Sequence, residues 1–542
     1  MRQVGHSYQQ FAIEDVYDAI VIGSGMGSLT AAALLAKHAG RKVLVLERHY
    51  TAGGFTHVFR RPNYEWDVGV HYIGGVGDPK SPVRAAFDHV TEGRLGWSPM
   101  PDVYDRILIA GRGYDFPSGI ERFRERIKQY FPDEAGAIDQ YIAAVCAASA
   151  ASGLYFAEKA IPAPIARLIG PLLRRRFLRY ADRTTAQVLG QFTGNRELIA
   201  VLTGQWGDYG LPPGESSFGM HAMIAYHYFG GAWYPVGGAS EIAAGIAPVI
   251  ERAGGQIVVS AEVSEILIER GCAVGVRMAD GRELKARTIL SDVGAYNTFA
   301  HLLPGGGVPE ELKSIPISMS HACLYVGLKR EAGEAEFGDT NLWIYDGPDH
   351  DAAVERYSAD PSAPFPAVFI SFPSAKDPTF PERYPGCSTI EVVAPMPYGA
   401  FERWADTRWK RRGPDYEDFK NGLAARLRAE LERHVPATRG KIDYAELSTP
   451  LSTRHFSNYA QGEIYGYAAV PARFRARSLG ARTHIRGLYL TGQDAGTAGV
   501  TGALFSGAVT ASLVLGRNLV SKLTRPSGSS RTVPAGPQAE PR

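Results

Sequence analysis

A glycine-rich run near the N-terminus has the spacing of a phosphate-binding loop. Gly23, Gly25 and Gly27 alternate with single residues, and Ser28 follows directly. The first glycine permits a tight turn, the second lets bare backbone approach a pyrophosphate, and a helix N-terminus behind them offers N–H groups to that anion. Ser28 replaces the third glycine of the usual fingerprint, and its small side chain still permits close packing of helix on strand. The run therefore predicts a dinucleotide site.

An acidic residue follows this loop at the expected distance. Glu47 lies about twenty positions on, where its carboxylate can accept hydrogen bonds from ribose hydroxyls and would repel the 2′-phosphate of NADP. Arg48 comes next, and Gly53 and Gly54 provide a second place where backbone can approach the cofactor. No second loop of this kind occurs, so the electron partner stays open: a quinone, oxygen, a reductase or a transiently bound nicotinamide.

The elements that must position these residues form a βαβ unit, which is typical of parallel sheets in α/β folds. A hairpin signal, Asp280-Gly281, lies between two later apolar runs. The predicted strands are 17–22, 43–46, several within 255–291, and 487–491, and the predicted helices include 29–39 and 502–520.

The predicted fold class is α/β, with a Rossmann-like dinucleotide domain (parallel sheet, helices and a β-meander) and an interleaved α+β substrate or cap domain. A chain of 542 residues exceeds one usual hydrophobic core, so two domains are expected. We assign the first domain to residues 1–90, 233–318 and 481–521, the second to a mainly helical part 91–232 and a sheet-containing part 319–480, and a disordered tail to 522–542.

Composition excludes several classes. The formal net charge of +2 gives no support to nucleic-acid binding. Four widely separated cysteines form no metal-ligand spacing, so we predict no metal site and a reducing compartment. The first residues lack the apolar segment of a signal peptide, and no long uncharged apolar run predicts a spanning helix. A cytoplasmic protein is expected.

The order Glu47-Arg48 followed by Gly53-Gly54 resembles the GR2-type FAD-binding signature shared by amine oxidases, phytoene desaturases and Rab GDP-dissociation inhibitors. This resemblance implies FAD as the cofactor. It also implies that an acidic residue near the C-terminus meets ribityl or phosphate groups, that a late helix N-terminus lies near the flavin, and that a mid-chain residue meets the adenine through its backbone. The corresponding residues are Gly492, Gln493, Asp494, Thr501, Gly502 and Val263.

Longer motifs resemble the retinol saturase branch of the phytoene desaturase and carotenoid isomerase family. They include GVHYIG at 69–74, GDYGLPP at 207–213 and WYPVGG at 233–238, and the similarity runs from about residue 17 to about 520. It implies redox at a carbon–carbon double bond of a polyene or isoprenoid lipid, with hydride transfer through flavin N5. A flavin-dependent cis/trans isomerase, an amine oxidase-like enzyme and a non-catalytic binding protein like the GDP-dissociation inhibitors are the alternatives.

Two polar residues are candidates for the chemistry. His71 and Tyr72 follow the segment that should approach the flavin, and either can donate a proton or bond a substrate hydroxyl. The sequence identifies no further acid. An isoprenoid needs an apolar tunnel, and aromatic or family-motif residues are predicted to line it. These residues are Trp233, Tyr234, Trp343, Glu463 and Tyr465.

Residues 161–180 mix apolar clusters with five arginines. This composition suits an interfacial segment on an anionic leaflet, and equally a cap helix with solvated arginines. We predict a peripheral contact with the inner face of the membrane through the region of Arg174, Arg175 and Arg176.

Overall fold

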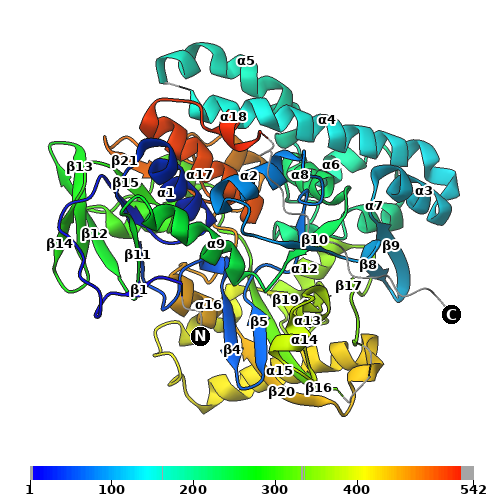
Figure 1. The fold of residues 1–542 in the computed structure, drawn as a ribbon. Coiled ribbons are helices and arrows are strands. Elements are labelled where there is room, and N and C mark those ends of the chain that lie inside the picture. The colour runs from blue at the N-terminus through cyan, green and yellow to red at the C-terminus, as the bar shows by residue number, and fades with distance from the viewer. Residues whose placement is uncertain (1–3, 162, 331–333, 335, 526–542) are drawn as a thin grey trace.

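A six-stranded sheet in which every neighbouring pair is parallel forms one side of the molecule (Figure 1). The computed structural model describes residues 4–161, 163–330, 334 and 336–525. In sheet order the strands are β1 (His6–Ser7), β11 (Gln256–Val259), β3 (Val43–Glu47), β2 (Ala19–Ile22), β15 (Ile289–Ser291) and β21 (Leu488–Leu490).

Three helices pack beside this sheet: α1 (Met26–Ala39), α9 (Ser240–Glu251) and α17 (Val500–Leu515). The predicted βαβ unit is confirmed by β2, α1 and β3. Small residues let α1 approach its neighbours closely, since a Cβ on Gly27 would lie 2.4 Å from the Gly492 nitrogen and one on Gly507 2.4 Å from the Gly27 carbonyl oxygen. The first turn of α1 is therefore in close backbone contact with α17 and with Gly492.

An antiparallel meander, β12 (Val263–Glu269), β13 (Cys272–Met278) and β14 (Glu283–Lys285), completes the Rossmann-like half. The predicted turn at Asp280-Gly281 joins β13 to β14, and Gly281 has a φ of +92°. The α/β class with a parallel sheet, helices and a meander is confirmed.

A seven-stranded mixed sheet forms the second half. In sheet order its strands are β20 (Ile442–Ser448), β16 (Ser320–Lys329), β19 (Cys387–Met396), β18 (Val368–Ser371), β17 (Asn341–Tyr345), β8 (Val103–Ile109) and β9 (Arg112–Pro117). The strands β8 and β9 come from the segment predicted as mainly helical, so that segment begins by extending this sheet. Long helix α15 (Pro414–His434) packs on β19, β20 and β16.

A group of helices lies in the upper part of Figure 1. The main ones are α3 (Ile120–Tyr130), α4 (Ala135–Ala160), α5 (Ala163–Ala181) and α8 (Phe218–Tyr228), and α4 contacts α5, α8 and α17. Among the described residues the stretch Pro132–Ala160 is long and apolar enough to cross a membrane by length and composition, which the sequence reasoning had not anticipated. Its contacts make it part of the cap.

The remaining elements are short. The strands are β4 (Val58–Arg61), β5 (Tyr64–Asp67), β6 (Ile73–Gly74), β7 (Trp97–Pro99) and β10 (Ala232–Pro235), and the helices are α2 (Pro82–Thr91), α6 (Thr185–Leu189), α7 (Arg196–Leu202), α10 (Ala295–Asn297), α11 (Glu310–Lys313), α12 (His350–Ala359), α13 (Pro373–Lys376), α14 (Phe380–Arg383), α16 (Pro450–Ser457) and α18 (Val520–Leu523). The predicted tail thus begins inside α18, and residues 526–542 lie outside the described part of the chain.

Candidate active site

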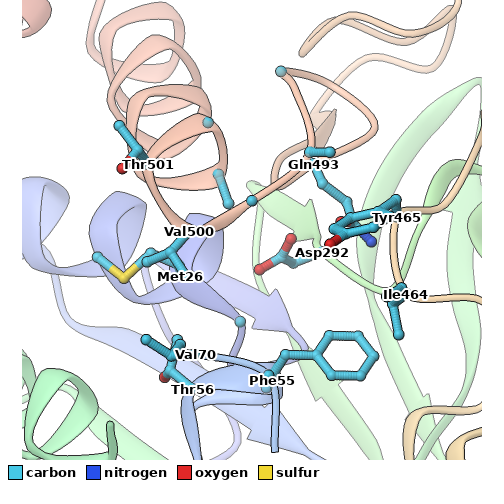
Figure 2. Close-up of a pocket in the computed structure, with 18 of the residues that line it drawn as sticks. Met26, Phe55, Thr56, Val70, Asp292, Ile464, Tyr465, Gln493, Val500 and Thr501 are labelled. Carbon is cyan, nitrogen blue, oxygen red and sulfur yellow. The ribbon is translucent and has the colours of Figure 1, made fainter. Parts of the chain in front are cut away.

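A continuous cavity of about 2280 Å³ runs from the glycine loop to the second sheet. Pockets for one small ligand usually measure about 300–1,000 Å³, so this cavity has room for a dinucleotide and a second molecule. Figure 2 shows residues from several distant segments around it. Those labelled are Met26, Phe55, Thr56, Val70, Asp292, Ile464, Tyr465, Gln493, Val500 and Thr501.

The glycine loop presents bare backbone to the cavity. Gly23 has a φ of +91°, and Gly25, the residue before α1, has no side chain with which to cap the helix. A Cβ on Gly25 would lie 2.6 Å from Oδ2 of Asp292, and one on Gly54 3.0 Å from the Gly25 Cα. Gly53 and Gly54 also line the cavity. Asp292 accepts from one N–H group of the first turn, that of Ser28, and the N–H groups before it are left for an anion, as a pyrophosphate site requires.

Glu47 stands at the carboxyl end of β3 and lines the cavity. Its Oε2 accepts hydrogen bonds from the Ser24 nitrogen (2.9 Å) and Ser24 Oγ (2.7 Å), and its Oε1 accepts one from the His49 nitrogen (2.8 Å). The carboxylate is therefore fixed in place with acceptor capacity remaining for hydroxyl groups. Arg48 also lines the cavity, but its guanidinium donates to the His455 carbonyl (2.7 Å) and ties α16 to β3.

Asp292, directly after β15, is a cavity residue that the sequence reasoning missed. Its Oδ2 accepts a hydrogen bond from the Ser28 nitrogen at 2.8 Å, which joins β15 to the first turn of α1. Burial, together with the nearby charges of Glu47 and Asp494, raises the pKa of Asp292 to about 7, although the hydrogen bonds from Ser28 oppose the rise. The usable clue was its place after a parallel strand, because ligands of such sheets bind at the carboxyl ends of the strands.

Asp494 differs from its predicted role. It is 3% exposed, does not line the cavity, and accepts hydrogen bonds from the nitrogens of Ala295 (2.8 Å) and Tyr467 (3.0 Å). An ion pair with Arg473 at 3.6 Å completes its surroundings. These backbone donors turn the carboxylate inward, so it ties chain segments together instead of facing a cofactor.

The rest of the closing motif does reach the cavity. Gln493 lines it and donates from Nε2 to the Tyr459 hydroxyl at 3.1 Å. Thr501 and Gly502 lie in the first turn of α17, which also begins without a side-chain cap. Val263 lines the cavity at the start of β12. Gly27, Ser28 and Gly492 stand behind the loops, where they permit close backbone contact.

His71 lines the cavity and contacts a buried acid. Its Nδ1 lies 2.7 Å from Oε2 of Glu391, whose Oε1 accepts a hydrogen bond from the Asp67 nitrogen at 2.9 Å. Burial lowers the pKa of His71 to about 4 and raises that of Glu391 to about 8. Lys376 donates to the His71 carbonyl at 3.1 Å. At neutral pH the pair is a protonated carboxyl beside a neutral imidazole.

Tyr72 is 6% exposed and reaches the cavity beside two carboxyl groups. Its hydroxyl lies 3.0 Å from Oδ2 of Asp105 and 3.0 Å from Oδ2 of Asp208, and its ring stacks on that of Tyr228 with centroids 4.5 Å apart. Asp208 lines the cavity, whereas Asp105 does not. The sequence motif at 207–213 contained Asp208, but nothing in its spacing marked it as an acid.

Two of the five predicted substrate-lining residues, Trp343 and Tyr465, line the cavity. The other three do not. Trp233 lies against Gly77 between neighbouring strands, and Tyr234 donates its hydroxyl to buried Asp67. Glu463 is 1% exposed and accepts a hydrogen bond from the Gln461 nitrogen at 2.8 Å. Tyr234 and Glu463 are buried in the protein core instead, and Trp233 packs half-buried against it.

Comparison with known proteins gives related sequences over nearly the whole chain. Residues 21–90 match the family described as an NAD(P)-binding Rossmann-like domain. The chain is 38% identical to all-trans-retinol 13,14-reductase of Danio rerio, over 93% of this chain and 86% of that protein. It is 26% identical to chloroplastic prolycopene isomerase 1 of an Oncidium hybrid cultivar, over 91% and 83%. The structure of cyclohexylamine oxidase from Brevibacterium oxydans shares the fold, with a TM-score of 0.59, 16% identity and coverage of 94% and 100%.

Proposed function

Because the chain belongs to the family of the all-trans-retinol 13,14-reductases, we propose that it is an FAD-dependent oxidoreductase that acts on a carbon–carbon double bond of a polyene or related isoprenoid lipid. The observation that carries the proposal is the continuous cavity, which joins a dinucleotide-type loop to an apolar, aromatic chamber. A protein that only bound a lipid would not need the first part, and a nucleotide-binding protein would not need the second.

FAD fits the dinucleotide end of the cavity. The N-terminus of α1 would hold the pyrophosphate, and Glu47 would accept hydrogen bonds from the adenosine ribose. The uncapped N-terminus of α17 would favour the negative charge of a reduced flavin. When bound, the flavin supplies hydride chemistry, while the protein supplies orientation and electrostatics.

The apolar end suits a long unsaturated chain. Sulfur-containing, aliphatic and aromatic side chains line it, and few of them carry charge. His71 is a polar group at this end that a substrate hydroxyl can meet, because its neutral ring offers a donor or an acceptor there. The lining includes Met223, Ile224, Met319, Trp343, Phe369 and Val393.

Isomerisation is the second candidate reaction. The observation in its favour is the similarity to a prolycopene isomerase over 91% of the chain. Both reactions use the same kind of cavity, and the product separates them. Saturation adds two hydrogen atoms to the polyene, whereas isomerisation leaves its mass unchanged.

We also propose a peripheral contact with an anionic bilayer, made by the α5 face: Ile165, Leu168, Ile169, Leu172, Arg175, Arg176 and Arg179. Leu168 is 83% and Leu172 71% exposed, which is costly in water unless a partner covers them. Helix α5 has arginines and no acidic residue, so the partner of best charge complementarity is an anionic lipid surface. Arg174 differs from its neighbours because it pairs with Glu158 at 3.4 Å.

The α5 face adjoins the cavity. The cavity lining includes Ala160 and Ile161, which immediately precede α5, and exposed Tyr226 of α8. A substrate that partitions into lipid would therefore enter beside the docked surface. We propose a cytoplasmic protein that docks on the inner face of the membrane.

The test is an anaerobic titration of purified protein. We expect flavin absorption in the isolated protein, bleaching on reduction, and return of the oxidised spectrum when all-trans-retinol is added. A saturated analogue of the alcohol serves as the control and should leave the flavin reduced. Mass spectrometry of the product distinguishes addition of two hydrogens from isomerisation. A protein that takes up no flavin even from excess FAD would contradict the proposal.

A further inference from the structure

Two buried carboxyl groups share one hydroxyl at the apolar end of the cavity. Tyr72 Oη lies 3.0 Å from a carboxyl oxygen of Asp105 and 3.0 Å from one of Asp208. A tyrosine hydroxyl has one hydrogen and donates to one acceptor at a time. The second carboxyl must therefore be protonated and donate its own hydrogen bond to the Tyr72 oxygen, or be ionised without a hydrogen-bond donor.

Asp105 is the carboxyl built to be ionised. It accepts from Gln205 Nε2 (2.7 Å) and Trp343 Nε1 (3.3 Å) at Oδ2, and from Asn341 Nδ2 (3.0 Å) at Oδ1. Three N–H donors besides the tyrosine stabilise a negative charge. Burial raises the pKa of Asp105, and these donors together with the charge of Lys376 oppose the rise.

Asp208 is the carboxyl built to be neutral. Among the described residues Tyr72 is its only side-chain hydrogen-bond partner, and no N–H group donates to its carboxyl. Burial and the negative charge of Asp105 raise the pKa of Asp208 well above its ordinary value. Since Asp208 lines the cavity, a protonated acid faces the substrate space.

We infer that Asp208 is the catalytic acid that protonates the substrate carbon, and that Tyr72 and Asp105 position it and keep it protonated. The inference rests on the proposed function. Saturation of a double bond consumes a hydride and a proton, and reduced flavin is the source of the hydride. The O–H bond of Asp208 breaks and its proton forms a C–H bond with the π electron pair. The other carbon of the double bond, left electron-deficient, would accept the hydride, and Asp208 remains as a carboxylate. Solvent protons restore the acid before the next turnover.

The other titratable groups that face Asp208 do not compete for this role. They are the phenols Tyr104, Tyr209, Tyr228, Tyr345 and Tyr465, and burial raises the pKa of each, so all stay neutral. Asp105 is thus the charge that controls the protonation of Asp208. The pH range of activity should therefore report the pKa of Asp208 and its dependence on the charge of Asp105.

The first experiment compares Asp208→Asn with the wild type, both loaded with FAD and reduced without oxygen. We expect the variant to bind all-trans-retinol normally and to be reoxidised by it about 10²- to 10⁴-fold more slowly, the usual contribution of a general acid. Reoxidation by oxygen, which needs no substrate acid, should be unchanged. Asp406→Asn is the matched control, because Asp406 is exposed and does not line the cavity.

The outcomes separate the two proposals. If retinol fails to reoxidise the wild type, the proposed function is wrong. If it reoxidises wild type and Asp208→Asn equally fast, the proposed function stands and the assignment of Asp208 is overturned.

Two further measurements do not depend on turnover of the Asp208 variant. The infrared difference spectrum of wild type minus Asp208→Asn, at neutral pH, should contain the C=O stretch of a protonated carboxyl. In the Tyr72→Phe background this band should be shifted. A carboxylate band in place of the C=O stretch would overturn the assignment. Asp105→Asn removes the negative charge that raises the pKa of Asp208, so the loss of activity at alkaline pH should move down by roughly one unit or more. If the alkaline limb of the pH–activity profile does not move in Asp105→Asn, Asp105 and Asp208 do not control the reaction.

Discussion

The imidazole of His71 is held by the carboxyl of Glu391, with Nδ1 and Oε2 2.7 Å apart and Glu391 fully buried. Because burial raises the pKa of Glu391 to about 8 and lowers that of His71 to about 4, the hydrogen between them belongs to Glu391 at neutral pH. The ring hydrogen of His71 then resides on Nε2. The buried acid thus fixes the tautomer of a cavity-lining donor.

We predict that His71 recognises the hydroxyl end of the substrate. His71→Leu should raise the KM for a polyene alcohol about tenfold, the effect of one lost hydrogen bond, and leave that for a polyene hydrocarbon unchanged. Glu391→Gln keeps an N–H donor for Nδ1 and should be mild, whereas Glu391→Leu should resemble His71→Leu. Steady-state kinetics with both substrates measures this. Equal losses for alcohol and hydrocarbon would contradict the assignment.

A second prediction concerns stability and the raised pKa of Asp292. Since this pKa is about 7 in the folded protein and about 3.9 in an unfolded chain, the folded state binds the extra proton and stability falls as pH rises through 7. Between pH 6 and 8 the ionisation of this group alone lowers the free energy of unfolding by about 1.4 kcal/mol. Asp292→Asn should therefore lose less stability than the wild type across that interval.

Chemical denaturation of the cofactor-free protein at both pH values measures the difference. Asp292→Asn can still accept the Ser28 hydrogen bond through its amide oxygen, so the fold should be kept. The control, Asp406→Asn, should follow the wild type. Parallel pH dependence in wild type and Asp292→Asn would show that Asp292 is already ionised at pH 6.

The dinucleotide loop was predictable because its information is local. Strand, turn, helix and acidic residue lie within about thirty positions, and Gly25 and Glu47 stand where that order puts them. For Asp292 and Asp494, in contrast, the neighbouring sequence does not predict which way the side chain points. Both follow parallel strands, and only contacts of Asp494 with Ala295 and Tyr467 decide that its side chain turns inward. Those contacts span long stretches of sequence.

The acid at the other end of the cavity had no sequence pattern at all. Asp208 is distinctive only because Tyr72 joins it to Asp105 from a separate segment, and hydrogen bonds from Asn341 and Gln205 favour the ionised form of Asp105. Similarly, Trp233 and Tyr234 were aromatic and close to a family motif, yet β10 pairs with β6 and β7, and Tyr234 is buried in the core while Trp233 packs half-buried against it.

A third prediction tests the dinucleotide end. Glu47→Gln keeps the shape of the side chain and removes the charge that would bind the ribose hydroxyls. Hydrogen bonds to charged groups contribute about 1.5–3 kcal/mol, so FAD affinity should fall about 10- to 100-fold. Fluorescence titration of cofactor-free protein measures it, and unfolding of that protein without FAD controls for damage to the Ser24 contacts. Unchanged affinity would place the ribose elsewhere.

The last prediction concerns the α5 face. Replacing both Leu168 and Leu172 by Ser should reduce sedimentation with anionic vesicles at least tenfold, because burying one leucine contributes about 1.5–3 kcal/mol. Arg175→Gln with Arg176→Gln should weaken binding to anionic vesicles about 5- to 30-fold, since each basic residue near such a surface contributes about 1 kcal/mol, and should remove part of the salt dependence. Val16→Ser is the matched control, because Val16 is 66% exposed and lies in another part of the fold. Turnover of detergent-dispersed retinol should be the same in all these variants. If the leucine pair sediments like the control, the α5 face is covered by something other than lipid.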